Sequence, residues 1–240
     1  MMQWRRCFES SMYFIILVIG VGTHSFCFAA KNSSIKKEVM KIQQEEELPL
    51  TEDLMREHGV LNRVLLIYEE IIRRIEGNEL PEQSLSQAVV IIKDFIENYH
   101  EKLEEDYLFP LFEKSKRQVS LVKTLRKQHV KGRDITAELQ GLIDMGGPKN
   151  KKREKQIVRL LKRFITMYRP HEAREDTVLF PQVRSLVSKK EFEQLGDKFE
   201  DLEYKLFGEE GFFGIVKRVA AIEKELGIYN LEQFTPTTYP

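Results

Sequence analysis

The chain has 240 residues, of which 38 are basic and 38 acidic, so its formal net charge is zero. This balance argues against a nucleic-acid-binding protein, which usually carries a basic excess, and against an acidic disordered tail. With two cysteines, the chain cannot build a disulfide scaffold or a four-cysteine metal site.

The first thirty residues have the pattern of an export signal. A positively charged start is followed by an uncharged apolar run over 12–22 and by small residues up to Ala30. We therefore predict a signal peptide over 1–30, cleaved after Ala29 or Ala30, and a periplasmic or secreted protein. The run is short for a membrane span of roughly 20 residues, which favours a signal peptide. Because no residue from Ser10 to Ala30 is charged, an uncleaved N-terminal membrane anchor is the alternative. Cleavage would remove both cysteines and one of the five histidines.

A polar linker is expected over 31–50, and beyond it hydrophobic residues recur with the period of amphipathic helices. Gly-Asn, Gly-Gly-Pro and single prolines punctuate this pattern, and Pro110 and Pro181 are expected to end helices. The predicted long helices cover about 51–76, 81–106, 118–145 and 151–176. Helices of this length with short connections predict an all-α fold, an up-down-up-down four-helix bundle over 51–185.

The C-terminal part, 186–240, is expected to form a helical extension on the outside of the bundle. Two shorter helices are predicted over about 188–207 and 211–226, and the tail after Gly227 is expected to be extended. These helices are a candidate surface for a homodimer, and the candidate contacts are Phe207, Phe212 and Phe213. Packing of the same phenylalanines on the bundle is the alternative.

Two segments of the chain repeat each other and account for every histidine outside the leader. The segment from His100 reads HEKLEEDYLFP and the segment from His171 reads HEAREDTVLFP, with six of eleven positions identical. A further histidine lies 42 residues before each of them, at His58 and at His129. The four histidines therefore form two copies of one unit.

Helix geometry predicts that these side chains converge. Residues i and i+4 lie about 40° apart around a helix, so the first histidine of each repeated segment shares a face with a glutamate. The other two histidines lie in register with the leucines of their own apolar stripes. One histidine from each long helix and two carboxylates can thus meet inside the bundle. The predicted site comprises His58, His100, Glu104, His129, His171 and Glu175.

A metal site explains this pattern better than structural roles do. A single histidine on an apolar stripe is usually a hydrogen-bonded core residue, but this does not explain the duplicated spacing. Four buried imidazoles beside carboxylates are also costly to desolvate without a partner. Imidazole and carboxylate ligands suit iron, manganese or zinc. Six ligands exceed the four of one tetrahedral ion, which points to two ions that Glu104 and Glu175 are able to bridge.

These motifs resemble those of the hemerythrin-like (HHE cation-binding) family. The resemblance covers about residues 50–185 and rests on REHGVL around His58, on His129 and on the two repeated segments. It implies a non-haem di-iron centre with two iron ions as cofactor and dioxygen or a related small ligand as partner. The four histidines would be terminal ligands and the two glutamates bridges. Asp176 is a rival of Glu175, because oxygen-carrying members place an aspartate at that offset.

One position departs from the family pattern. Oxygen-carrying members have a second histidine four residues after His129, and Arg133 stands there, whose guanidinium cannot ligate iron. We expect it to pair with Glu101 or Glu172, or to reach solvent. Glu101 also stands where some members place an extra ligand.

The resemblance implies storage, delivery or sensing of dioxygen. With one imidazole fewer, the ligands of the iron ions are harder donors. This favours oxidation of the iron over reversible release of dioxygen. The alternative is therefore a di-iron oxidoreductase or iron-handling protein, acting on peroxide or nitric oxide or donating iron. Tyr168 is expected to pack in the core or, alternatively, to donate a hydrogen bond beside the site.

Overall fold

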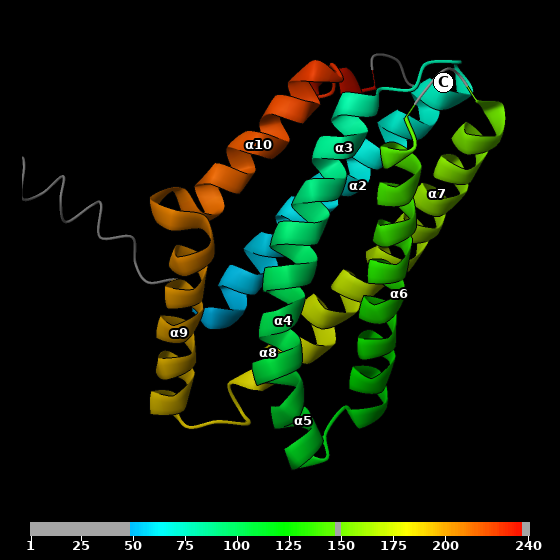
Figure 1. Cartoon of the computed structure of the whole chain (residues 1–240). Helices are drawn as coiled ribbons and strands as arrows, with labels where there is room; N and C mark the ends of the chain where they lie inside the picture. Colours follow the sequence, from blue (N-terminus) through cyan, green and yellow to red (C-terminus); the bar gives the residue numbers. More distant parts are fainter. Residues whose placement is uncertain (1–48, 147–149, 237–240) are drawn as a thin grey trace, which may run out of the picture. The chain divides into compact units, whose positions relative to one another are not determined.

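The computed structural model describes residues 49–146 and 150–236. The predicted leader with its cleavage site and nearly all of the predicted linker lie outside the described residues. Within these two ranges every regular element is a helix, which confirms the all-α prediction (Figure 1). None of the helices in the described part is long and apolar enough to cross a membrane.

The first half of the bundle consists of two long helical stretches. The first is the single helix α2, Leu50–Glu76. The second is continuous in the chain but alternates between α and π geometry. Its segments are α3 (Glu82–Ile91), the π-helical η1 (Ile92–His100), α4 (Glu101–Leu103), the π-helical η2 (Glu104–Leu108) and α5 (Phe109–Ser115).

The second half repeats this plan. Helix α6 spans Val119–Asp144, and α7 spans Lys151–Arg174. The stretch that begins with α7 continues through the π-helical η3 (Glu175–Leu179) into α8 (Phe180–Val183). Asn150 is the N-cap of α7. Its side-chain oxygen accepts hydrogen bonds from the backbone N–H groups of Lys152 and Arg153, which is the usual role of an N-cap asparagine.

The expectation that Pro110 and Pro181 end their helices is wrong. Each proline lies in the first turn of a new α segment that follows a π-helical segment. A proline is tolerated there because the N–H groups of a first helical turn have no partner inside the α segment. Near Pro110, the carbonyl of Glu105 accepts a hydrogen bond from the guanidinium of Arg126 at 3.1 Å instead.

The C-terminal extension packs against the first half of the bundle. It consists of α9 (Lys189–Phe207), the 3₁₀ turn η4 (Gly208–Glu210), α10 (Gly211–Glu225) and the 3₁₀ turn η5 (Leu231–Phe234). Helix α10 lies along α2 and α3 (Figure 1). The expectation of a wholly extended tail is wrong for η5.

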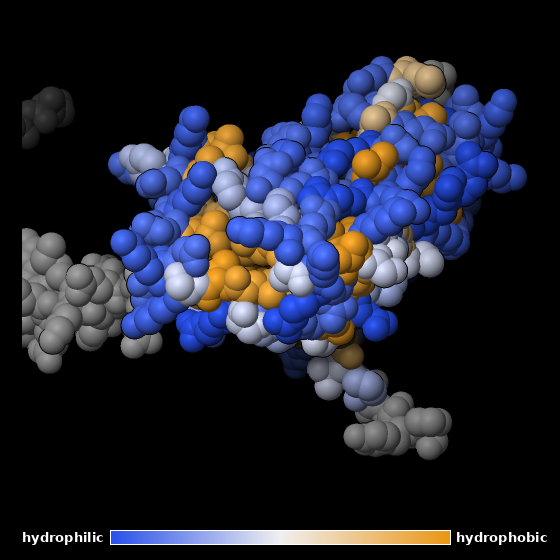
Figure 2. All heavy atoms as spheres, turned by 90° about the horizontal axis from the view of Figure 1, so that it is seen from below, coloured by the Kyte–Doolittle hydropathy of each residue, from blue (hydrophilic) through white to orange (hydrophobic). Residues whose placement is uncertain are grey.

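The hydrophobic core is continuous from the bundle to the extension. Phe95 and Tyr99, both buried in the second stretch, contact the ring of Phe207, and Phe95 also contacts Phe212. Phe213, by contrast, is 53% exposed. Two of the three candidate dimer contacts therefore pack inside the chain. On the face seen from below, hydrophilic side chains surround patches of hydrophobic ones (Figure 2).

Candidate metal centre

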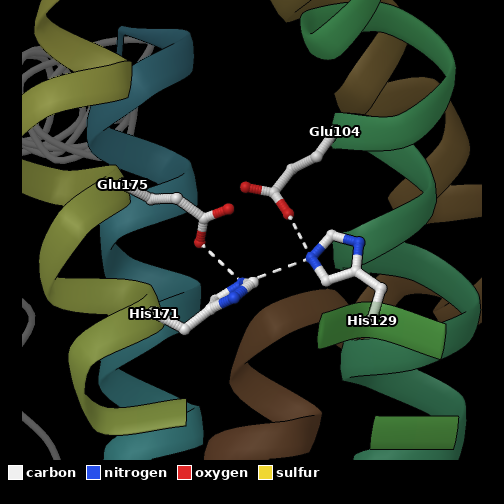
Figure 3. A group of neighbouring side chains, drawn as sticks. All are labelled: Glu104, His129, His171 and Glu175. Carbon is white, nitrogen blue, oxygen red and sulfur yellow. Dashed lines mark hydrogen bonds and ion pairs between the residues drawn. The ribbon is translucent and has the colours of Figure 1, made fainter. Parts of the chain in front are cut away.

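The structure brings all six predicted side chains together in the interior. The four histidines come from α2, the end of η1, α6 and α7, while the two glutamates open the π segments η2 and η3. None of the six is more than 4% exposed. Figure 3 shows four of them, Glu104, His129, His171 and Glu175, pointing toward one another.

The histidines form two pairs that face each other through Nε2. The Nε2 atoms of His58 and His100 are 2.9 Å apart, and those of His129 and His171 are 3.2 Å apart. Each pair consists of two histidines that are 42 residues apart in the chain. The duplicated spacing in the sequence thus corresponds to two matching pairs in space.

Each glutamate lies between the two pairs. Glu104 Oε2 is 3.9 Å from Nε2 of His100 and 3.4 Å from Nε2 of His129. Glu175 Oε2 is 3.5 Å from Nε2 of His58 and 3.1 Å from Nε2 of His171. Both carboxylates therefore contact one imidazole of each pair, which is the position that a bridging ligand requires.

In the first pair, carboxylates hold the outward nitrogens of both rings. His58 Nδ1 lies 2.7 Å from Asp176 Oδ1, and His100 Nδ1 lies 2.6 Å from Glu57 Oε2. A histidine whose Nδ1–H donates to such an oxygen presents the lone pair of its Nε2 on the opposite side of the ring, toward the cluster. Asp176 therefore contacts the outer side of a histidine, and Glu175 is the residue that points into the cluster.

The second pair is held in the same way by one carboxylate and one amide. His129 Nδ1 lies 3.1 Å from Glu105 Oε1, and His171 Nδ1 lies 2.9 Å from Gln128 Oε1. Outer partners of this kind fix the orientation and tautomer of an imidazole that binds a metal through its other nitrogen. All four rings are thus preoriented with Nε2 toward the centre.

Two phenylalanines fix the planes of two of the rings. Phe180 stacks on His58 with ring centroids 5.4 Å apart, and Phe109 stacks on His129 at 5.5 Å. Each phenylalanine belongs to the half of the bundle opposite to its histidine. Both follow directly on a π-helical segment, a feature that is common at functional sites.

Of these supporting residues, Asp176 was expected only as a rival ligand and the others were not expected at all, although the sequence holds a signal for them. The two histidine units are offset by 71 residues, and the same offset relates every supporting residue of one half to one of the other. The related pairs are Glu57 with Gln128, Glu105 with Asp176, and Phe109 with Phe180.

Arg133 of α6 pairs with two glutamates of the first half of the bundle. Its NH2 group lies 2.8 Å from Glu101 Oε2 and 2.6 Å from Glu105 Oε1, which confirms the expected pairing with Glu101. The hydroxyl of Tyr168 donates to the other oxygen of Glu101 at 2.6 Å. Tyr168 is therefore both a buried core residue and a hydrogen-bond donor beside the site.

Burial sets the electrostatics of the cluster. Burial, and then the charge of Glu175, raise the pKa of Glu104 well above its ordinary value. Burial acts in the same direction on Glu175, but the imidazoles of His171 and His58 outweigh it and lower its pKa to about 2. Burial lowers the pKa of His100 to about 4. Uncharged imidazoles are the form that binds metal ions.

The donor atoms of the cluster fit a metal. Four Nε2 lone pairs converge, and none of the four carboxylate oxygens of Glu104 and Glu175 receives a well-aligned hydrogen bond within the described residues. Buried polar atoms rarely lack partners unless an unseen group satisfies them. Imidazole and carboxylate donors suit iron, manganese and zinc, as the sequence already indicated.

Comparison with known proteins agrees with this geometry. Residues 50–183 match the hemerythrin HHE cation binding domain. Uncharacterized proteins of Mycobacterium tuberculosis and Mycobacterium bovis are 44% identical over 196 residues, which is 80% of this chain and 77% of theirs. No solved structure matches the chain. The chain therefore belongs to the hemerythrin HHE cation-binding domain family.

Proposed function

We propose that this protein is a non-haem di-iron protein that binds dioxygen for storage, delivery or sensing. Its fold would be the up-down-up-down four-helix bundle of the family, formed by residues 51–185. The observation that carries the proposal is the position of Glu104 and Glu175, each of which contacts one imidazole of both histidine pairs.

The proposal assigns one iron ion to each histidine pair. His58 and His100 would hold one ion, His129 and His171 the other, and the two glutamates would bridge them. A pair of iron ions supplies the electrons that dioxygen binding requires. The chain contributes the preoriented imidazoles, two carboxylates between them and surrounding buried side chains that exclude water.

Metal analysis and absorption spectroscopy test this proposal. The full chain is loaded with iron, and its spectrum is recorded without oxygen, in air, and after oxygen is removed again. Absorption bands that appear in air and reverse afterwards support dioxygen binding. His100→Ala and His171→Ala are each expected to halve the iron content, and Lys131→Ala, at an exposed position of α6, serves as the control. Wild-type iron content in both histidine variants would contradict the assignment.

One observation favours the alternative of a di-iron oxidoreductase or iron-handling protein. Arg133 stands at the position of a second histidine of oxygen carriers and is bound to Glu101 and Glu105. The site therefore has fewer imidazole donors, which favours oxidation over reversible release. Absorption bands that persist after oxygen is removed, with consumption of peroxide or nitric oxide, support this alternative.

The location of the protein is a separate proposal. The pattern of residues 1–30 supports export to the periplasm or beyond, with an uncleaved membrane anchor as the alternative, and residues 31–50 would link it to the bundle. The mass of the protein isolated from its host distinguishes these alternatives, because cleavage removes residues 1–30 and an uncleaved anchor retains them. A homodimer through the extension, 186–240, is proposed on the exposed Phe213, and sedimentation tests it.

A further inference from the structure

Three carboxylates meet on the outer side of the predicted centre, beyond His100. Asp53 and Glu57 of α2 and Glu203 of α9 each offer an oxygen, and these three atoms lie within 4.8 Å of one another. Glu57 is fully buried, whereas Asp53 and Glu203 are partly exposed. The cluster thus reaches from the surface to the outer partner of a histidine.

Two buried polar atoms at this cluster lack a hydrogen-bond partner. Glu57 binds His100 through Oε2, and its other oxygen, Oε1, is buried without a hydrogen bond. The hydroxyl of Tyr99 is also buried without a well-aligned hydrogen bond. It lies close enough to Glu57 and Glu203 to interact with both carboxyl groups, and burial followed by the charges of Glu57 and Glu203 raises its pKa.

The other contacts hold the carboxylates in place and supply one positive charge. Glu203 Oε1 accepts a hydrogen bond from the backbone N–H of Phe212 at 2.8 Å. The same oxygen fills the space beside Gly211, where a Cβ would lie 2.3 Å from it. Arg56 pairs with Asp53 at 2.5 Å. The cluster thus contains three carboxyl groups and one guanidinium group, that of Arg56.

The second half of the bundle shows that orienting a histidine does not require these charges. Gln128 holds His171 as Glu57 holds His100, at a similar distance. The residue 71 positions after Asp53 is Thr124, so this half has no matching acidic pair. An amide suffices for the orienting contact, and the additional carboxylate oxygens of the first half need another explanation.

We propose that Asp53, Glu57 and Glu203, with the hydroxyl of Tyr99, form an outer site for one hard divalent cation such as Ca²⁺ or Mn²⁺. Carboxylate and hydroxyl oxygens are the donors that such ions select. This site contains no imidazole donor and differs in that respect from the buried centre. It does not depend on the identity of the metal in that centre.

Terbium luminescence tests the outer site. Tb³⁺ is a hard cation, and its emission is sensitised by a nearby tyrosine. The full chain is first loaded with zinc to occupy the buried centre and is then titrated with Tb³⁺. We expect one saturable site whose emission Ca²⁺ or Mn²⁺ displaces. Glu203→Gln and Asp53→Asn should each weaken Tb³⁺ binding by about tenfold or more, since affinity follows the number of charged ligands.

Control variants make the result specific. Glu193→Gln, on the exposed surface of α9, should bind Tb³⁺ like the wild type, and Tyr99→Phe should reduce the emission. Glu203→Gln retains an oxygen that can accept the Phe212 N–H, and circular dichroism verifies its fold. Wild-type affinity in both Glu203→Gln and Asp53→Asn, or loss of emission in Glu104→Gln, would overturn the proposal. Failure of the iron proposal would instead appear as unchanged iron content in His100→Ala.

Discussion

Gly132 has no side chain, and the phenol of Tyr168 fills the space that one would occupy. A Cβ at this position would lie 1.9 Å from the tyrosine hydroxyl, which donates to Glu101. We expect Gly132→Ala to lower the free energy of unfolding by about 1–3 kcal/mol, as overpacking does. Urea denaturation of Gly132→Ala and of the wild type measures this difference in the free energy of unfolding.

Gly141 on the same helix provides the matched control. Nothing lies within 4 Å of a Cβ built there, so Gly141→Ala should stabilise the protein by up to about 1 kcal/mol through helix propensity. Equal effects of Gly132→Ala and Gly141→Ala would show that Tyr168 moves aside without cost.

Glu172 makes the stability of the metal-free protein depend on pH. Burial, and then the charges of Asp176 and Glu175, raise its pKa from the ordinary value of 4.5 to about 8. Between these two pH values the folded state holds a proton that the unfolded state has released. Stability therefore falls as pH rises through this window, and the loss is complete above the folded pKa.

The comparison of Glu172→Gln with the wild type isolates this group. The amide cannot ionise, so the stability of the variant relative to the wild type should increase from pH 4.5 to pH 8. Urea denaturation at several pH values of the metal-free proteins measures the difference. A difference that does not change with pH would show that Glu172 has the same pKa in the folded and unfolded states.

Residue positions were partly predictable from the sequence. The duplicated spacing of the four histidines predicted their convergence, because helix periodicity converts spacing into a shared face. The outer partners were less accessible, because Glu57 and Gln128 are ordinary polar residues unless the 71-residue offset is applied to them. The choice between Glu175 and Asp176 needed the structure, since adjacent residues on a helix point about 100° apart and only one can face the cluster.

At the scale of the elements, the π-helical segments place the glutamates and their neighbours. The segments η2 and η3 begin at Glu104 and Glu175 and are followed at once by Phe109 and Phe180. An extra residue in a turn rotates the next turns of the helix, and both phenylalanines stack on histidines of the opposite half. This geometry depends on contacts between distant residues, so local sequence patterns predicted plain helices here.

Pro110 is expected to stabilise the π-helical segment η2, which lies just before it in the chain. In Pro110→Ala the restored N–H is free to form α-helical hydrogen bonds, and the unfolded chain gains conformational freedom. We expect a loss of about 0.4–1 kcal/mol in the free energy of unfolding, together with weaker iron binding as Phe109 turns from His129. Pro181→Ala should behave alike, since it is the same position of the other half. Greater stability of either variant would mean that the proline strains the helix.

At the scale of the whole described structure, the extension stabilises the bundle through a few aromatic residues. Phe212 is 8% exposed and contacts Phe95, and Arg63 joins α2 to α10 through two hydrogen bonds to Glu223. The sequence predicted the helices of the extension, but an amphipathic pattern does not tell which face of the bundle a helix will cover.

Phe212→Ala tests the contribution of the extension to stability. Truncation of a buried phenylalanine typically costs about 3–5 kcal/mol, and we expect a loss near the lower value in urea denaturation. Phe213→Ala is the control and should change stability by less than about 0.5 kcal/mol, because its ring is exposed. Similar losses in both variants would indicate that Phe213 is buried in solution, as it would be in a dimer.

The contacts that hold the rings cross between the two halves of the bundle. His58 is held by Asp176, 118 residues later, and covered by Phe180, while His129 is held by Glu105. Neither half can therefore complete its own histidine pair. Such distant contacts form late, because closing a long loop costs entropy that only the finished contacts repay. The consequence is that the cluster of imidazoles is complete only when both halves of the bundle have packed together, so a change that separates the halves also dismantles the site.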